Sequence, residues 1–202
     1  MSTPLHSSHA GSGLCRASEE QPLHGAVSQQ CGRDDARPTS WAACFATKCI
    51  DPVDLPNLLC SLRSQGLKIA TANGSFDLFH AGHLHFLYEA SLAADHLIVA
   101  LNTDSSIQRY KSTKRPIISL QHRLEMVAAL AFVDYVTWFD ELDPRALLEV
   151  IRPEVHVNGI EYGAACIESE VVTRHGGRLH LVERKEGLAT SSVIQRIIQQ
   201  CD

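Results

Sequence analysis

The most constraining feature of the chain is a pair of histidines, His80 and His83, with Gly82 between them. An apolar stretch at residues 67–72 precedes the pair and predicts a strand, and residues 83–94 follow it with a helical pattern. A helix start offers unpaired backbone N–H groups and the positive end of the helix dipole, so it favours anions. Gly82 has no Cβ and lets a ligand approach the main chain, and imidazoles can donate hydrogen bonds to phosphate oxygens. The pattern therefore predicts nucleotide phosphate binding and phosphoryl or nucleotidyl transfer.

Composition and charge exclude several classes of partner. The 202 residues carry a net charge of -5, which gives no electrostatic reason to expect nucleic acid as the main partner. No apolar run approaches the roughly 18 residues that span a bilayer, and residues 1–12 are too polar for a secretory signal. The seven cysteines match no zinc-binding spacing, so we expect reduced thiols in a cytoplasmic protein and no dedicated metal site.

The chain changes character near residue 50. Residues 1–49 hold few strong aliphatic side chains, and serine, histidine, glycine and glutamine fill the gaps. Such a stretch buries too little apolar surface to offset its ordering entropy, so we predict a disordered N-terminal extension at 1–49 and a folded domain at 50–202. The histidine pair makes this folded domain the expected nucleotidyltransferase domain. Trp41 and Phe45 could instead form a local docking patch.

From residue 50 onward, strand and helix patterns alternate. The run at residues 97–101 is apolar on both faces, which fits a strand buried in a parallel sheet. Strands separated by helices need right-handed crossovers, so the predicted fold class is α/β, a Rossmann-like three-layer sandwich with a parallel five-stranded sheet. Ligands bind at the carboxyl ends of the strands in such sheets. The predicted strands are 67–72, 95–102, 133–139, 155–158 and 178–182, and the predicted helices are 52–65, 83–94, 103–110, 119–130, 143–151, 167–175 and 190–200.

The sequence Gly74-Ser75-Phe76-Asp77-x-x-His80-x-Gly82-His83 resembles the signature of the cytidylyltransferase-like nucleotidyltransferase superfamily, which shares its paired histidines with class I aminoacyl-tRNA synthetases. The resemblance implies that both histidines are catalytic. It also implies nucleotide-binding roles for Asn73, Gly74, Ser75, Phe76 and Gly82.

Plainer interpretations of this motif stay open. His80 and His83 could merely cap and pack the helix that they begin. Phe76 could be a core residue or a wall of the site. Asp77 is assigned to substrate binding, but it could instead orient a backbone turn.

Basic and acidic residues beyond the motif are assigned to catalysis or to the substrate side. Asp104 follows the strand at 95–102 and is predicted to shape the substrate site, although it could simply cap the next helix. Lys111 and Arg115 lie in a basic loop, where Lys111 is predicted to be catalytic and Arg115 to bind substrate. Arg123 lies on the following helix, where its long side chain could swing into the cleft. Taken alone, a basic loop is usually solvated surface.

Two later segments are assigned to the nucleotide. Gly159 suits close backbone approach at the end of the fourth strand, and Glu161 could accept a hydrogen bond from a base amine. Residues 184–192 resemble the Arg-x-x-Gly-Ile-Ser-Thr-Thr element of the superfamily, and hydroxyls at a helix start make an anion cradle. The residues of this element assigned to nucleotide binding are Arg184, Gly187, Thr190 and Ser191. A plain turn at residue 159 and ordinary N-capping at residue 190 are the alternatives.

Within the superfamily, the likeness is strongest to the adenylyltransferase domain of ADP-heptose synthases, over residues 67–198. It implies direct transfer of a nucleoside monophosphate from ATP to a phosphorylated acceptor such as heptose 1-phosphate, with Mg²⁺ carried by the nucleotide. Three positions depart from that family: Asn158 stands where lysine is usual, Glu161 where aspartate is usual, and Ala189 where the first hydroxyl is usual.

Residues 184–187 also resemble glycerol-phosphate cytidylyltransferases, so the choice between ATP and CTP stays open. A nucleotide-binding module that has lost turnover is a further alternative, because of Asn158 and Ala189. We also expect a homodimer, because dimers are the commonest oligomers of soluble proteins.

Overall fold

The computed structural model describes residues 40–183 and 190–200, apart from the side chains of residues 191 and 192. These residues belong to one compact unit. The five strands of the described part are β1 (Ile69–Gly74), β2 (His96–Asn102), β3 (Tyr135–Phe139), β4 (Val155–Gly159) and β5 (Arg178–Val182).

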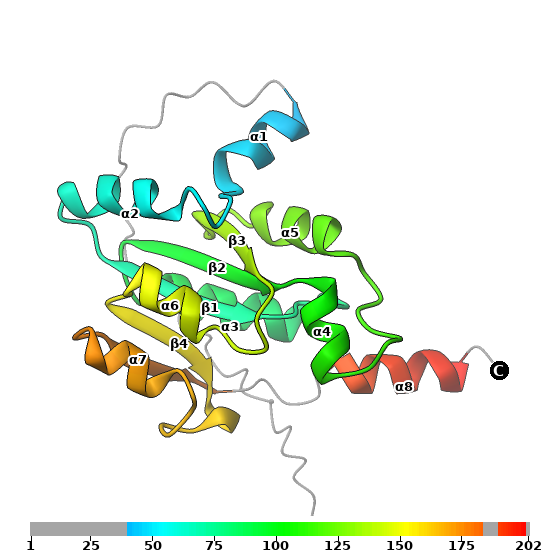
Figure 1. The fold of residues 1–202 in the computed structure, drawn as a ribbon. Coiled ribbons are helices and arrows are strands. Elements are labelled where there is room, and N and C mark those ends of the chain that lie inside the picture. Colours follow the sequence, from blue (N-terminus) through cyan, green and yellow to red (C-terminus); the bar gives the residue numbers. More distant parts are fainter. Residues whose placement is uncertain (1–39, 184–189, 201–202) are drawn as a thin grey trace, which may run out of the picture. The chain divides into compact units, whose positions relative to one another are not determined.

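All strand pairs in the described sheet are parallel, in the order β3-β2-β1-β4-β5 (Figure 1). The chain starts in the middle with β1, moves outward through β2 to β3, and then returns to the other side of β1 with β4. The direction of winding therefore reverses between β1 and β4, where doubly wound sheets open a crevice for ligands. The predicted fold class is confirmed.

Helices cover both faces of the sheet (Figure 1). The helices α3 (Ala81–Ser91) and α5 (Leu120–Ala128) pack on one face, and α2 (Leu55–Ser64) and α6 (Arg145–Ile151) pack on the other. The other described helical elements are α1 (Trp41–Lys48), α4 (Asp104–Tyr110), the 3-10 turn η1 (Ile160–Tyr162), α7 (Ser169–Arg174) and α8 (Thr190–Gln200). None of the described helices is both long and apolar enough to cross a bilayer.

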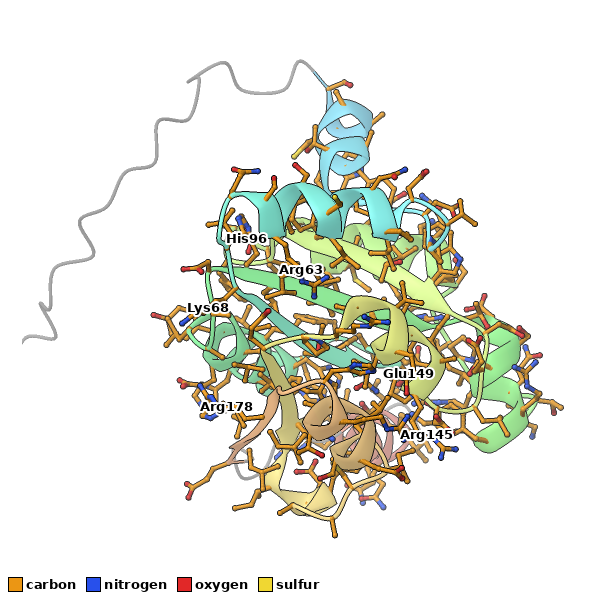
Figure 2. All side chains as sticks on the ribbon, turned by 60° about the vertical axis from the view of Figure 1, so that its left-hand side comes forward. Arg63, Lys68, His96, Arg145, Glu149 and Arg178 are labelled. Atoms are coloured by element: carbon orange, nitrogen blue, oxygen red, sulfur yellow. The ribbon has the colours of Figure 1, made fainter. Side chains whose placement is uncertain are left out.

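The central strands explain why the sheet is buried on both sides. In β2, Leu97 and Val99 join the core under α3 and α5, whereas Ile98 and Ala100 join the core under α2 and α6. Side chains of a strand alternate between faces, so a run without polar residues serves both cores at once. Arg63 fastens α2 to α6 by donating to the carbonyls of Ile151 and Arg152 (Figure 2).

The prediction of disorder up to residue 49 is wrong for residues 41–49. Ser40 caps α1, and Phe45 packs against the core under α5. Lys48 donates through Nζ to the carbonyls of Leu130 and Val133, at 2.9 and 2.7 Å. The segment is ordered because its few apolar and basic groups find distant partners that local composition does not reveal. Residues 1–39 lie outside the described residues.

Candidate active site

A cleft opens at the carboxyl ends of β1 and β4. Its volume is about 350 Å³, which lies within the range of small-molecule sites. Most residues predicted for catalysis and nucleotide binding line it: Asn73, Gly74, Ser75, Phe76, His80, Gly82, His83, Lys111, Gly159, Glu161 and Thr190. The histidine pair and the first residue of the last helix therefore share one cavity.

The two histidines stand at the start of α3 as a stacked pair. The ring centroids of His80 and His83 are 3.9 Å apart, with 18° between the ring planes. His80 Nδ1 accepts a hydrogen bond from the Gly82 backbone N–H at 3.1 Å, so His80 does cap the helix. That bond places the proton of a neutral His80 ring on Nε2. Capping thus selects the tautomer that can donate to an anion.

Phe76 packs against the ring of His83. It adopts a φ of 42°, which is uncommon for a residue other than glycine. Its side chain is 3% exposed, and its ring meets the His83 ring edge-on with centroids 5.4 Å apart. A Cβ at Gly74 would lie 3.2 Å from the Phe76 ring, so glycine allows this close packing. Phe76 is therefore a core residue that also forms a wall of the site.

Lys111 brings a cation into the cleft from the end of α4. Its Nζ donates to Ser75 Oγ at 3.0 Å. Burial lowers the pKa of Lys111, and the nearby Arg115 guanidinium lowers it further. Of the described residues that line the cleft, Lys111 is the one with a lysine or arginine side chain. It is thus placed to balance the charge of a bound polyanion.

The structure pairs Asp77 with Arg115, and their assignment to substrate binding stays a prediction. The Asp77 side chain is 2% exposed, and it accepts hydrogen bonds from the backbone N–H groups of Ile117 and Ile118 at 3.0 Å. It also pairs with Arg115 Nε at 3.1 Å. A buried carboxylate is stable when it is paired and hydrogen-bonded in this way. Asp77 therefore orients backbone, as the plainer interpretation of the motif had it.

Arg123 and Asp104 are likewise paired with each other, and their assignment to substrate binding stays a prediction. Arg123 is fully buried, and its guanidinium donates to Asp104 Oδ1 at 2.7 Å and to the carbonyls of Ser75, Asn102 and Ile118 at 2.6 to 2.9 Å. Neither residue is among the described residues that line the cleft. An arginine that meets so many fixed acceptors does not swing toward solvent.

The opposite side of the cleft is formed by the end of β4 and by η1. The Glu161 carboxylate folds over Gly159, where a Cβ would come within 2.3 Å of Glu161 Oε2. Asn158 is 5% exposed and donates through Nδ2 to Glu168 Oε2 at 3.3 Å. A carboxylate can only accept, so this bond fixes the orientation of the amide. A neutral, oriented amide thus stands at a position where the resemblance led us to expect lysine.

Part of the predicted phosphate cradle falls beyond what the structure describes. Thr190 begins α8 and lines the cleft. Arg184 and Gly187 lie outside the described residues, as does the side chain of Ser191. Their roles stay predictions.

Comparison with known proteins decides the family. The cytidylyltransferase-like family matches residues 71–185, more than half of the chain. The chain belongs to the cytidylyltransferase-like family. The superfamily predicted from the histidine motif is thereby confirmed, and the domain is a nucleotidyltransferase.

Curated relatives of this cytidylyltransferase-like domain are longer proteins. The chain is 37% identical over 148 residues to the bifunctional protein HldE of Marinomonas sp., a match that covers 73% of the chain and 31% of the relative. It is 35% identical over 198 residues to HldE of Caulobacter vibrioides, covering 93% of the chain and 41% of the relative. The chain thus spans less than half the length of these relatives.

A solved structure shares the fold. The pantoate-beta-alanine ligase of Francisella tularensis, in complex with beta-gamma ATP and beta-alanine, matches with a TM-score of 0.52. The match covers 76% of this chain and 80% of that one at 14% sequence identity, so it supports the fold assignment alone.

Some cleft residues of the cytidylyltransferase-like domain had no assigned role. Phe86 lies one turn after His83 on α3, so helical spacing from the motif could have found it. Val182 and Glu183 end β5, where the strand-end rule points. The complete set is Phe86, Asn158, Tyr162, Val182 and Glu183.

The arrangement suits charge stabilisation at a phosphate better than proton abstraction. Two imidazoles, one ammonium and a helix start converge on the cleft, and each can hold negative charge. Within the described ranges 40–183 and 190–200, no group of three or more histidine, cysteine, aspartate or glutamate side chains gathers to hold a metal ion.

Proposed function

We propose that the domain moves a nucleoside monophosphate from ATP or CTP to a small phosphorylated acceptor, a sugar 1-phosphate such as heptose 1-phosphate, and releases pyrophosphate. The observation that carries the proposal is that the stacked His80 and His83, Lys111 and Thr190 line one cleft at the switch point of the sheet. The resemblance to heptose adenylyltransferases supports the choice of acceptor. The alternative acceptor is glycerol 3-phosphate, with CTP as donor.

The reaction is a direct displacement. An acceptor phosphate oxygen attacks the α-phosphorus in line, the bond from that phosphorus to the β-bridging oxygen breaks, and pyrophosphate leaves with the bonding electrons. His80 and His83 donate to the oxygens on which charge builds, and Lys111 draws the two polyanions together. Thr190 and the start of α8 hold the β and γ phosphates. Positioning and charge stabilisation supply most of the rate in such reactions.

Mg²⁺ is expected with the triphosphate, where it neutralises phosphate charge. The side chains beside the cleft fit an ion that arrives on the nucleotide. Glu183 offers carboxylate oxygens, the ligand type that Mg²⁺ prefers, while phosphate oxygens and water fill most of its sites.

The test is a pyrophosphate-release screen that crosses ATP, CTP, GTP and UTP with a panel of phosphorylated sugars and alcohols. We expect turnover with ATP or CTP and one class of acceptor. The domain as enzyme is refuted when calorimetry detects nucleotide binding but no combination releases pyrophosphate. That outcome would establish the second candidate, a binding module without turnover, which the neutral Asn158 at a position usually held by lysine favours.

Two further expectations accompany the proposal. We propose a cytoplasmic location, where nucleoside triphosphates and sugar phosphates are found. We also propose a homodimer, which size-exclusion chromatography with light scattering can measure.

A further inference from the structure

Residues 111–118, here called the 111–118 segment, run from the end of α4 back over the loop that follows β1. Lys111 stands at one end of the segment and lines the cleft, whereas Ile117 and Ile118 stand at the other end. We propose that Asp77 and Arg123 are positioning residues that clasp this segment against the β1 loop and thereby hold the Lys111 ammonium in the cleft. The inference rests on the proposed function for the role of Lys111, but the clasp itself is a property of the fold.

Asp77 supplies the first half of the clasp. Its buried carboxylate accepts hydrogen bonds from the backbone N–H groups of Ile117 and Ile118 and pairs with Arg115 Nε. All three donors belong to the 111–118 segment, whereas Asp77 itself belongs to the motif loop. Taking a carboxylate out of water is costly unless such partners replace the water. The geometry therefore makes the closed position of the segment a condition for burying Asp77.

Arg123 supplies the second half. Its guanidinium is fully buried and donates to the Ser75 carbonyl at 2.6 Å, the Asn102 carbonyl at 2.9 Å and, through Nε, the Ile118 carbonyl at 2.9 Å. Asp104 Oδ1 accepts from the same group at 2.7 Å and pairs with its charge. These acceptors belong to the β1 loop, the end of β2, the far end of the segment and the start of α4. The planar fork of arginine can join several such acceptors, which the point charge of lysine cannot do.

Lys111 lies between these anchors. Its backbone N–H donates to the Ile107 carbonyl at 2.9 Å, and its Nζ donates to Ser75 Oγ at 3.0 Å. Ser75 is thus held twice, through its carbonyl by Arg123 and through its hydroxyl by Lys111. Neither Asp77 nor Arg123 is among the described cleft-lining residues, so both act on the cleft through others.

The charges explain why the clasp needs an acid. The segment carries Lys111, Lys114 and Arg115, and it closes over the cationic Arg123. These like charges repel one another, and the Arg115 charge lowers the pKa of Lys111. Asp77 is the carboxylate that pairs with Arg115, and its charge raises the pKa of Lys111 in opposition. Removing the Asp77 carboxylate leaves the repulsion between these cations without a compensating negative charge.

A double-mutant cycle tests whether Asp77 acts through Lys111. Asp77→Asn is expected to lower kcat/KM at least tenfold in the native background and less than threefold in a Lys111→Ala background. Arg123→Lys is expected to behave in the same way. Equal losses in both backgrounds would overturn the proposal, because a purely structural residue costs activity whether or not Lys111 is present.

Matched controls exist elsewhere in the chain. Asp134 also accepts a backbone N–H bond, from Leu97 at 2.8 Å, and Arg63 also donates to backbone carbonyls, but both lie outside the cleft. Asp134→Asn and Arg63→Lys are therefore expected to change kcat/KM less than twofold. A tenfold loss in either control would mean that any such bond matters, and would remove the case for a clasp.

Hydrogen exchange separates the clasp from the proposed function. In Asp77→Asn, peptides that span residues 111–119 are expected to exchange at least tenfold faster than in the native protein, and peptides of β2 and β3 to stay unchanged. Unchanged exchange at 111–119 would overturn the clasp whatever the activity. Should the native protein release no pyrophosphate with any substrate, the proposed function fails, and the cycle is then read from the Kd of ATP by calorimetry with the same expected pattern.

Discussion

The two walls of the cleft differ in how their polar groups are held. The β1 wall comprises Ser75, His80, His83 and Lys111, and the fully buried Arg123 stands behind it. The β4 wall comprises Asn158, Gly159, Glu161 and Tyr162. On the β1 wall, Lys111 donates to Ser75, and His80 accepts from the Gly82 N–H at the start of α3.

On the β4 wall, the two polar side chains of η1 are exposed, as is Lys111 on the β1 wall. Tyr162 is 65% exposed, and Glu161 is also exposed at the surface of η1. Asn158 is the buried member, held by Glu168. Groups that stabilise a transition state must not reorganise during the reaction, whereas groups that recognise a base can adjust. We therefore propose that the β1 wall carries the chemistry and that the β4 wall selects the nucleotide.

The largest effect is expected from His83→Ala on the β1 wall. Loss of one preorganised donor typically costs about 10²- to 10³-fold in kcat, and His83 also stacks on His80. Steady-state pyrophosphate release measures the change. His85→Ala is the matched control, because His85 lies on the same helix with a side chain 38% exposed, and it should alter kcat less than twofold. Equal rates for His83→Ala and the native protein would end the assignment of chemistry to this wall.

Much of the fold and of the β1 wall could be predicted from the sequence. The alternating strand and helix patterns predicted the parallel sheet, and the motif at residues 74–83 predicted a site with two histidines at the strand ends. Strand order follows from crossovers between distant elements, so the pairing of β1 with β4 is not visible in any local window. That α1 is an ordered helix was missed for the same reason, because Lys48 donates to acceptors more than eighty residues away in the sequence.

Arg123 shows where sequence reasoning stops. Its charge predicted a reach toward substrate, since arginine is rarely buried. Burial became favourable because Asp104 and several strand-end carbonyls converge on it in the fold. Asp77 was recognised within the motif, but its partners Ile117 and Ile118 are apolar residues whose backbone N–H groups leave no trace in the sequence.

Acid is expected to lower the free energy of unfolding through His156, which lies in β4. His156 of β4 is fully buried, with Nδ1 2.8 Å from Thr71 Oγ1 of β1, and burial lowers its pKa to about 4 from 6.5. The unfolded chain binds the proton first as pH falls, so the contribution of neutral His156 to stability is complete above pH 6.5 and is lost as pH falls toward 4. The loss is on the order of 3 kcal/mol in the free energy of unfolding.

Urea unfolding between pH 7 and pH 4 measures this loss. His156→Leu removes the titrating group, so the free energy of unfolding should change less with pH, by a similar amount. His85→Ala should leave the pH dependence of the free energy of unfolding as in the native protein. A native-like slope in His156→Leu would show that acid acts elsewhere.

Lys111 should set an alkaline limb in the pH profile of the β1 wall. Its pKa is lowered by burial, so the ammonium loses its proton, and the cleft its cation, at a lower pH than an ordinary lysine of pKa 10.5. We expect kcat/KM to fall on the alkaline side before that pH, by about tenfold once the charge is gone. Lys111→Arg keeps its charge at these pH values and should lose the limb, whereas Lys114→Arg should keep it. A limb that persists in Lys111→Arg would assign it to another group.

The smallest effect is expected from Glu161→Ala on the β4 wall. A hydrogen bond that an exposed carboxylate accepts from a base amine is worth about 1 kcal/mol, so KM for ATP or CTP should rise roughly fivefold while kcat stays unchanged. UTP carries no such amine, so its KM should not rise, and the preference over UTP should narrow. Glu183→Ala, which removes the other carboxylate that lines the cleft, should leave the preference as it is. A tenfold fall in kcat for Glu161→Ala would place chemistry on both walls, because a group that only selects the base acts equally on the ground state and the transition state.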